Sequence, residues 1–225
     1  MKNLFIISVL SILTITATAQ KKSKEVETFE GTITYNVIPN GDIDANTKAQ
    51  LPTEVVTSYK GNQSCTVQKT SMGSITVIAN SESKEQIVLF DMMGQKMAIK
   101  SSKEETEKAL KEYPEAKINV TTETKQIAGY KCKKVEVTLN DKVSNVYVAD
   151  DIKVSNANWQ SPYKNISGVM LEYSQTTGQD QDISLTYTAK EVKKGKVKND
   201  IFSIPSDYKQ MTMDEFQKMF GGGEE

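Results

Sequence analysis

The chain of 225 residues contains no histidine. This absence excludes Ser-His-Asp and Cys-His nucleophile systems, and it removes a common ligand of zinc, copper and haem iron. It also removes the usual general base for chemistry near pH 7. Carboxylate pairs can hydrolyse glycosides, but the aspartate pairs Asp150-Asp151 and Asp180 with Asp182 are typical of turns. We therefore expect a protein that is not an enzyme and that has no metal site and no cofactor.

Cysteine is scarce as well, because Cys65 and Cys132 are the only two in the chain. Each lies in a strand-like segment, and neither has the C-x-x-C setting of a redox-active thiol. In an exported chain two thiols can form one disulfide. Two separate buried thiols, each behaving as a small hydrophobic side chain, are the alternative. Both alternatives stay open, because a disulfide needs Cα atoms within about 7 Å of each other and the sequence does not give that distance.

The chain also lacks an excess of one charge, because its 28 Lys and Arg residues are balanced by 29 Asp and Glu residues. Nucleic-acid binding requires a concentrated basic face. The lysine-rich run at 190–198 is more typical of an edge strand whose lysines block unwanted pairing. We therefore expect no nucleic-acid partner.

No apolar run in the chain reaches the roughly twenty residues that span a bilayer. The run Leu4–Ile15 follows a basic start and ends on the small residues of Thr16–Ala19. This order is typical of a secretory signal peptide that is cleaved before Gln20. Because Gln20 is not a cysteine, the lipoprotein route is disfavoured. We predict a signal peptide at 1–19, a periplasmic or secreted mature protein and no transmembrane segment.

Alternation of apolar and polar residues predicts strands through most of the mature chain. The predicted strands are 29–37, 55–60, 63–70, 74–79, 86–92, 96–100, 117–124, 134–139, 144–149, 169–176 and 183–192. Two helices are predicted, at 102–113 and at 212–220, and each begins with a capping box. About ten short antiparallel strands require a curved sheet, whose concave face would bury the helices. We therefore expect an α+β fold, with a flexible lead-in at 20–28, one domain at 29–220 and a flexible tail at 221–225.

Methionines gather in two parts of the chain, around residues 92–97 and around the C-terminal helix. Methionine is flexible and polarisable, so such clusters suit a cavity that accepts acyl chains of varied shape. The alternative is a core that uses methionine as filler. The candidate cavity residues are Met92, Met93, Met97, Met211, Phe216, Met219 and Phe220. The C-terminal helix would act as a lid over the cavity.

An irregular stretch near Pro162 contains Trp159, the only tryptophan, and Tyr163. Aromatic side chains on loops often contact a ligand or a partner protein. The alternative is a loop that plugs one end of the sheet.

Five segments together resemble a family of exported proteins of Gram-negative bacteria that is known as a domain of unknown function. The segments are Phe29-Glu30-Gly31 and the residues at 127–132, 146–152, 166–173 and 202–208. That family is similar to the LolA/LolB-like carriers of lipoproteins. The resemblance implies an unclosed half β-barrel whose helices cover an apolar cavity, with a lipid or a lipoprotein as partner. The implied function is non-catalytic binding or carriage of a hydrophobic ligand in the periplasm. A structural or interaction module of the cell envelope, with a filled core, is the alternative.

Overall fold

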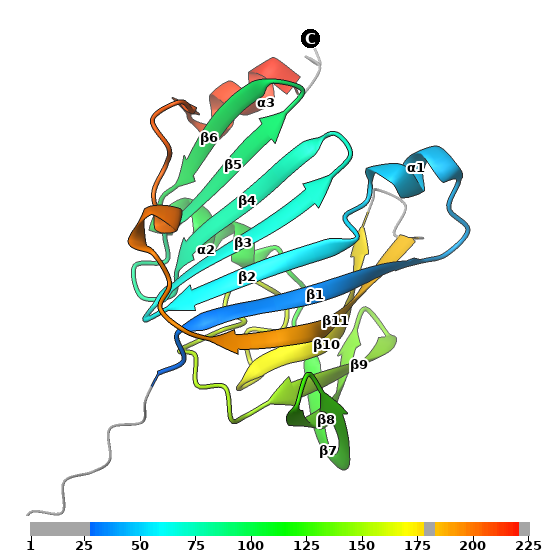
Figure 1. The fold of residues 1–225 in the computed structure, drawn as a ribbon. Helices are drawn as coiled ribbons and strands as arrows, with labels where there is room; N and C mark the ends of the chain where they lie inside the picture. Colours follow the sequence, from blue (N-terminus) through cyan, green and yellow to red (C-terminus); the bar gives the residue numbers. More distant parts are fainter. Residues whose placement is uncertain (1–27, 178–182, 221–225) are drawn as a thin grey trace, which may run out of the picture.

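The computed structural model describes residues 28–177 and 183–220, which form one 12-stranded sheet (Figure 1). The strand order is β12-β6-β5-β4-β3-β2-β1-β11-β10-β9-β8-β7, and every neighbouring pair is antiparallel except β12 with β6. The strands are β1 Gly31–Asn40, β2 Glu54–Lys60, β3 Gln63–Thr70, β4 Gly73–Asn80, β5 Gln86–Met92, β6 Gln95–Ser101, β7 Lys117–Ile127, β8 Tyr130–Leu139, β9 Lys142–Ala149, β10 Val169–Thr177, β11 Ile183–Lys194 and β12 Lys209–Met211. The helices are α1 Ala45–Gln50, α2 Lys103–Lys111, the 3-10 turn η1 Asn199–Phe202 and α3 Met213–Phe220. The two outermost strands, β12 and β7, do not pair with each other, so the sheet is open.

Short-range sequence patterns account for most of these strands. In β1, Ile33, Tyr35 and Val37 are buried and alternate with less buried residues, as the pattern predicts. The β8–β9 hairpin turns at Asn140 and Asp141, whose φ angles of 48° and 59° are those of a tight hairpin turn that matches the strand twist. The predicted strands are confirmed, and β3 and β5 have the predicted bounds.

The sheet curves strongly, which the sequence also predicts. Val77 of β4 and Tyr173 of β10 line the same hollow, although β3, β2, β1 and β11 lie between their strands in the sheet. Residues so far apart in a flat sheet would not face each other. The face that carries them is therefore concave.

The centre of the concave face is covered by the β9–β10 loop, residues 150–168. Its side chains Ile152, Trp159, Tyr163 and Ile166 are all buried. The side-chain amide of Asn158 donates to the carbonyl oxygens of Ile166 and Gly168, at 2.8 Å and 2.9 Å. These two bonds hold the loop in a compact form without secondary structure.

The helices contribute less than the sequence predicts. Ser102 and Glu105 form the predicted capping box of α2, yet Thr106 is the only buried residue of that helix. Helix α1, which is not predicted, buries no residue. The expectation that helices are the main layer in the concavity is therefore corrected, because the β9–β10 loop supplies the large apolar side chains there. No helix within residues 28–177 and 183–220 has the length and apolar character needed to cross a membrane.

The strand count of twelve also corrects the expected ten or so. The short strand β12 pairs in parallel with β6, and Met211 lies opposite Ile99. These partners are more than a hundred residues apart, so no local pattern indicates the pairing. Between β11 and β12, residues 195–208 cross the convex face and pack Val197 and Phe202 on Cys65 and Leu89.

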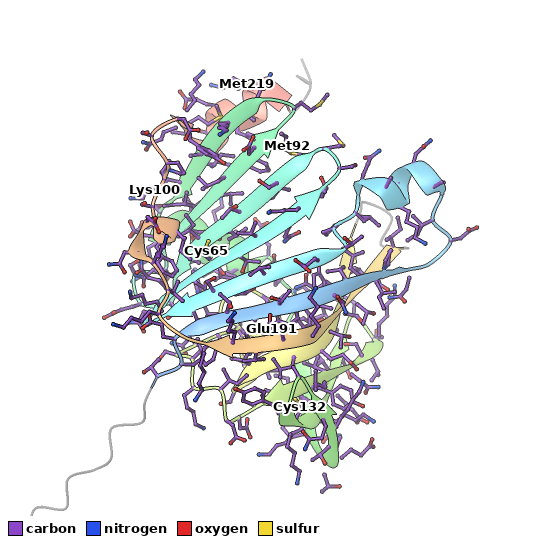
Figure 2. All side chains as sticks on the ribbon, viewed as in Figure 1. Cys65, Met92, Lys100, Cys132, Glu191 and Met219 are labelled. Atoms are coloured by element: carbon purple, nitrogen blue, oxygen red, sulfur yellow. The ribbon has the colours of Figure 1, made fainter. Side chains whose placement is uncertain are left out.

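Cys65 and Cys132 are free, buried thiols that lie in different clusters of the core. Five strands separate β3, which carries Cys65, from β8, which carries Cys132, and Figure 2 shows the two on different parts of the sheet. The two thiols are free and pack in separate core clusters, so they are not placed for a disulfide. The disulfide is therefore excluded in this fold, and the alternative of two separate thiols describes the protein.

Candidate functional site

The predicted methionine site is only partly assembled. Met97, Met211 and Phe216 meet in one cluster, where the ring of Phe216 stacks on Phe90 at 5.2 Å between centroids. Met92 is half-buried at the end of β5. This cluster packs α3 and β12 against β6 and closes that edge of the sheet.

The other predicted cavity residues are not part of this cluster. Met93 is 84% exposed in the β5–β6 turn, and Met219 is 53% exposed on α3. The side chain of Phe220 lies outside the described residues. Because Met93 lies in a turn and Met219 on the outer face of a short helix, neither side chain lines a cavity. The prediction that these two residues are cavity residues is therefore corrected.

Half-buried apolar side chains continue from this cluster along the concave face. Strand register places Val77 beside Val88, and Val88 beside Ile99. The neighbouring row joins Ile75 to Phe90 and then to Met97. The concave face of β4–β6 is therefore apolar as far as α3.

A further hollow of the concave face lies at its opposite end, between β7–β9 and the β9–β10 loop. We call it the valine hollow, and its volume is about 480 Å³. Its apolar lining consists of Ile118, Val120, Val135, Val148, Ile152, Val154 and Ile166, and its polar lining of Lys133, Asp150, Lys153, Asn165 and Ser167, with Gly168. Val120 is 64% exposed, so the hollow has an open apolar wall at the outer strand β7.

One ion pair lies in the polar lining of the valine hollow. The ammonium of Lys133 lies 2.5 Å from a carboxylate oxygen of Asp150. This hydrogen-bonded contact raises the pKa of Lys133 above its usual value, so the ammonium stays protonated at neutral pH. The hollow therefore offers an apolar wall with a closed ion pair beside it.

A second hollow of about 200 Å³, the tyrosine hollow, lies between the β9–β10 loop and strands β1–β4, β10 and β11. The rings of Tyr173 and Tyr187 stack there at 4.8 Å, and the hydroxyl of Tyr35 donates to the Met170 carbonyl at 3.0 Å. Burial raises the pKa of Tyr59 to about 12, so its hydroxyl stays neutral. Gln160, which also lines this hollow, has a buried amide nitrogen without a hydrogen-bond partner among the described residues.

A third hollow of about 400 Å³, the lysine hollow, lies where α2 meets the β9–β10 loop. Its lining comprises Lys84, Glu107, Leu110, Lys111, Asn156, Trp159, Lys164 and Asn165. The ammonium of Lys84 lies over the indole of Trp159, 4.7 Å from the ring centroid. This contact is a cation–π interaction.

Trp159 and Tyr163, the predicted partner-contact residues, are 7% and 5% exposed. The hydroxyl of Tyr163 donates to the Ser174 carbonyl at 2.9 Å. Of the two alternatives, the plug describes where these side chains lie. Contact of Trp159 or Tyr163 with a partner stays a prediction.

The aspartate pairs do not form a catalytic arrangement in the part of the chain that the structure describes. Asp150 pairs with Lys133, and its neighbour Asp151 is exposed. Asp180 and Asp182 lie outside the described residues. In the described ranges, no three His, Cys, Asp or Glu side chains gather in a way that could hold a metal ion.

Sequence reasoning missed the valine hollow entirely. Its wall residues Val135 and Val148 lie in strands with ordinary alternation of apolar and polar residues, and such alternation predicts core packing. One available signal was the β7 pattern, which places apolar Ile118 and Val120 on an outer strand.

Comparisons with known proteins place the chain in a family. A family model described as "Domain of unknown function (DUF4412)" matches residues 29–208. The fold is similar to that of PNGF-II in two crystal forms, with TM-scores of 0.49 and 13% and 14% identity. These matches cover 85% of this chain, which spans about a third of the PNGF-II chain. No curated protein matches the chain.

Proposed function

We propose that this chain, which belongs to the DUF4412 family, binds a hydrophobic ligand without catalysis, and that the ligand occupies the valine hollow. The observation that carries the proposal is an open hollow of about 480 Å³ with seven Val and Ile side chains in its lining. Burial of apolar ligand surface there would contribute about 25 cal/mol per Å². Ligand pockets of this size are typically apolar with a few placed polar groups.

The distribution of filled and open space supports binding over a purely structural role. The β9–β10 loop fills the centre of the concavity, but the valine, tyrosine and lysine hollows remain around it. A structural module of the cell envelope would need no such space. That alternative predicts a protein that binds no apolar ligand.

The setting we propose for this binding is the periplasm of a Gram-negative bacterium. The apolar run and small-residue exit of residues 1–19 support export, with cleavage before Gln20. An open curved antiparallel sheet with an apolar concave face supports the resemblance to LolA/LolB-like carriers, so a lipid or an acylated protein is the proposed cargo. N-terminal sequencing of the protein from a periplasmic fraction tests export, and a start at Met1 would contradict it.

The binding test uses the neutral fluorescent probe N-phenyl-1-naphthylamine, whose emission rises in apolar sites. We expect saturable binding by the mature chain. Val120→Glu should weaken it by about tenfold or more, because a carboxylate in an apolar wall must be desolvated when the probe binds. Mass spectrometry of organic extracts of the purified protein identifies any natural ligand.

Val143→Glu is the matched control. Val143 is 67% exposed, close to the 64% of Val120, and it lies on β9 outside the lining of the hollow. It pairs with Thr138, whereas Val120 pairs with Val135. Equal loss in both variants would place the probe elsewhere and overturn the site. Absence of saturable binding together with a lipid-free extract would overturn the function in favour of the interaction module.

A further inference from the structure

The lysine hollow carries a net positive charge in a chain that is close to neutral. Its lining includes three lysines and one carboxylate, that of Glu107. Glu107 has its own partner outside the lining, Lys103, at 4.0 Å. None of Lys84, Lys111 and Lys164 forms an ion pair with a described carboxylate. Uncompensated cations around one hollow attract an anion.

Lys84 is fixed in place, unlike an ordinary surface lysine. Its backbone φ of 62° lies in the left-handed region, which non-glycine residues seldom occupy. Its backbone N–H donates to the Asn80 carbonyl at 2.9 Å, and its ammonium rests on the Trp159 ring. A cation that is already ordered loses less side-chain entropy when it binds an anion.

The lysine hollow adjoins the valine hollow. Asn165 lines both, and its neighbours divide between them, with Lys164 in the lysine hollow and Ile166 in the valine hollow. Lys153, which is exposed, adds another cation to the lining of the valine hollow. An apolar chain in the valine hollow can therefore place a polar end among lysines and the Asn165 amide.

We infer that the ligand is an anionic amphiphile, whose carboxylate or phosphate head binds Lys84, Lys111 and Lys164 while its apolar chain occupies the valine hollow. This inference rests on the proposed function and names the ligand class. Charge-assisted hydrogen bonds from the ammonium groups to the head would favour it over a neutral molecule with the same chain.

The test compares three ligands that share a twelve-carbon chain, namely dodecanoate, dodecyl phosphate and dodecanol. The two anions are kept below their critical micelle concentrations, and dodecanol is kept below its solubility limit. Displacement of N-phenyl-1-naphthylamine reports the apolar chain. Trp159 is the only tryptophan in the chain and lines the lysine hollow, so its intrinsic fluorescence reports the head. We expect the anions to displace the probe at concentrations about tenfold lower than dodecanol and to change the Trp159 emission. The order of dodecanoate and dodecyl phosphate then distinguishes a carboxylate from a phosphate head.

The variant Lys111→Glu with Lys164→Glu should abolish the preference for anions and leave dodecanol binding unchanged. Lys69→Glu with Lys142→Glu is the matched control, because these lysines are also exposed, lie outside both hollows and change the net charge equally. Circular dichroism verifies that both double variants fold. Lys111→Gln with Lys164→Gln replaces the first pair if the charge reversal prevents folding.

The possible failures are separable. If dodecanol displaces the probe as well as the anions do, or if the variant keeps the preference, the inference is overturned and the proposed function stands. If N-phenyl-1-naphthylamine does not bind the chain and the organic extract of the purified protein contains no lipid, both are overturned.

Discussion

The backbone N–H of Val197 donates to the side-chain carboxylate of Glu30 across a distance of 2.7 Å. Glu30 precedes β1, and Val197 lies near the start of the segment that crosses the convex face toward η1. The ammonium of Lys60 lies 3.6 Å from the same carboxylate. The Glu30 carboxylate thus connects the start of β1 to the segment that covers the convex face of the sheet.

Glu30→Gln should make the stability of the protein less dependent on pH. The Val197 hydrogen bond, with a smaller contribution from Lys60, lowers the pKa of Glu30 below its usual 4.5. A lowered pKa contributes stability above the unfolded-state pKa, and this contribution disappears as the pH falls through the folded-state pKa. Urea unfolding between about pH 6 and about pH 3 should therefore show a difference between wild type and variant that shrinks at the acidic end.

Glu191→Gln is the control for this measurement, because the Glu191 side chain is exposed on β11 and forms no ion pair with a described residue (Figure 2). The unfolding free energy of Glu191→Gln should stay close to that of the wild type at every pH measured. A pH-independent difference for Glu30→Gln would show that the carboxylate charge is not what stabilises the contact.

Gly168→Ala should destabilise the protein by about 1–3 kcal/mol. Gly168 lies at the boundary of the valine hollow with φ of +91°, a conformation that side chains other than glycine rarely adopt. A Cβ there would lie 2.7 Å from a methyl group of Val148 and 3.0 Å from the Ala149 carbonyl oxygen. Chemical denaturation measures the decrease in unfolding free energy. Gly195→Ala, where a Cβ would meet nothing within 4 Å, should change the stability by less than about 1 kcal/mol.

Phe202→Ala should cost about 3–5 kcal/mol of unfolding free energy. Phe202 is buried on the convex face together with Leu89 and Ala98, and its removal leaves a cavity between η1 and the sheet. Thermal unfolding provides the measurement. The exposed Met93→Ala should stay within about 0.5 kcal/mol of the wild type. A small effect of Phe202→Ala would mean that the crossing segment is detachable from the sheet.

Both thiols should resist alkylation in the folded protein. Burial raises the pKa of Cys65 and of Cys132 to about 11, so at pH 8 very little reactive thiolate is present. In denaturant without reductant, iodoacetamide should add two groups to each chain, as intact mass spectrometry can count. Alkylation that requires prior reduction would contradict the free thiols of this fold.

The sequence by itself determined the local elements. Alternation within β1, the capping box of Ser102 and Glu105, and the turn at Asn140-Asp141 depend on residues a few positions apart, so they could be predicted. The curvature of the sheet followed from the number of strands. The candidate site was predicted less well, because Met97, Met211 and Phe216 do meet while Met93 stays exposed.

Tertiary structure alone decided the remaining features, because each depends on partners distant in the sequence. Strand β12 forms only where Met211 reaches Ile99, and the two thiols are kept apart by five intervening strands. Trp159 is buried because the β9–β10 loop folds into the concavity. The valine and lysine hollows are the spaces between this loop and β7–β9 and between this loop and α2. The types of residue in the sequence do not indicate where such a space forms.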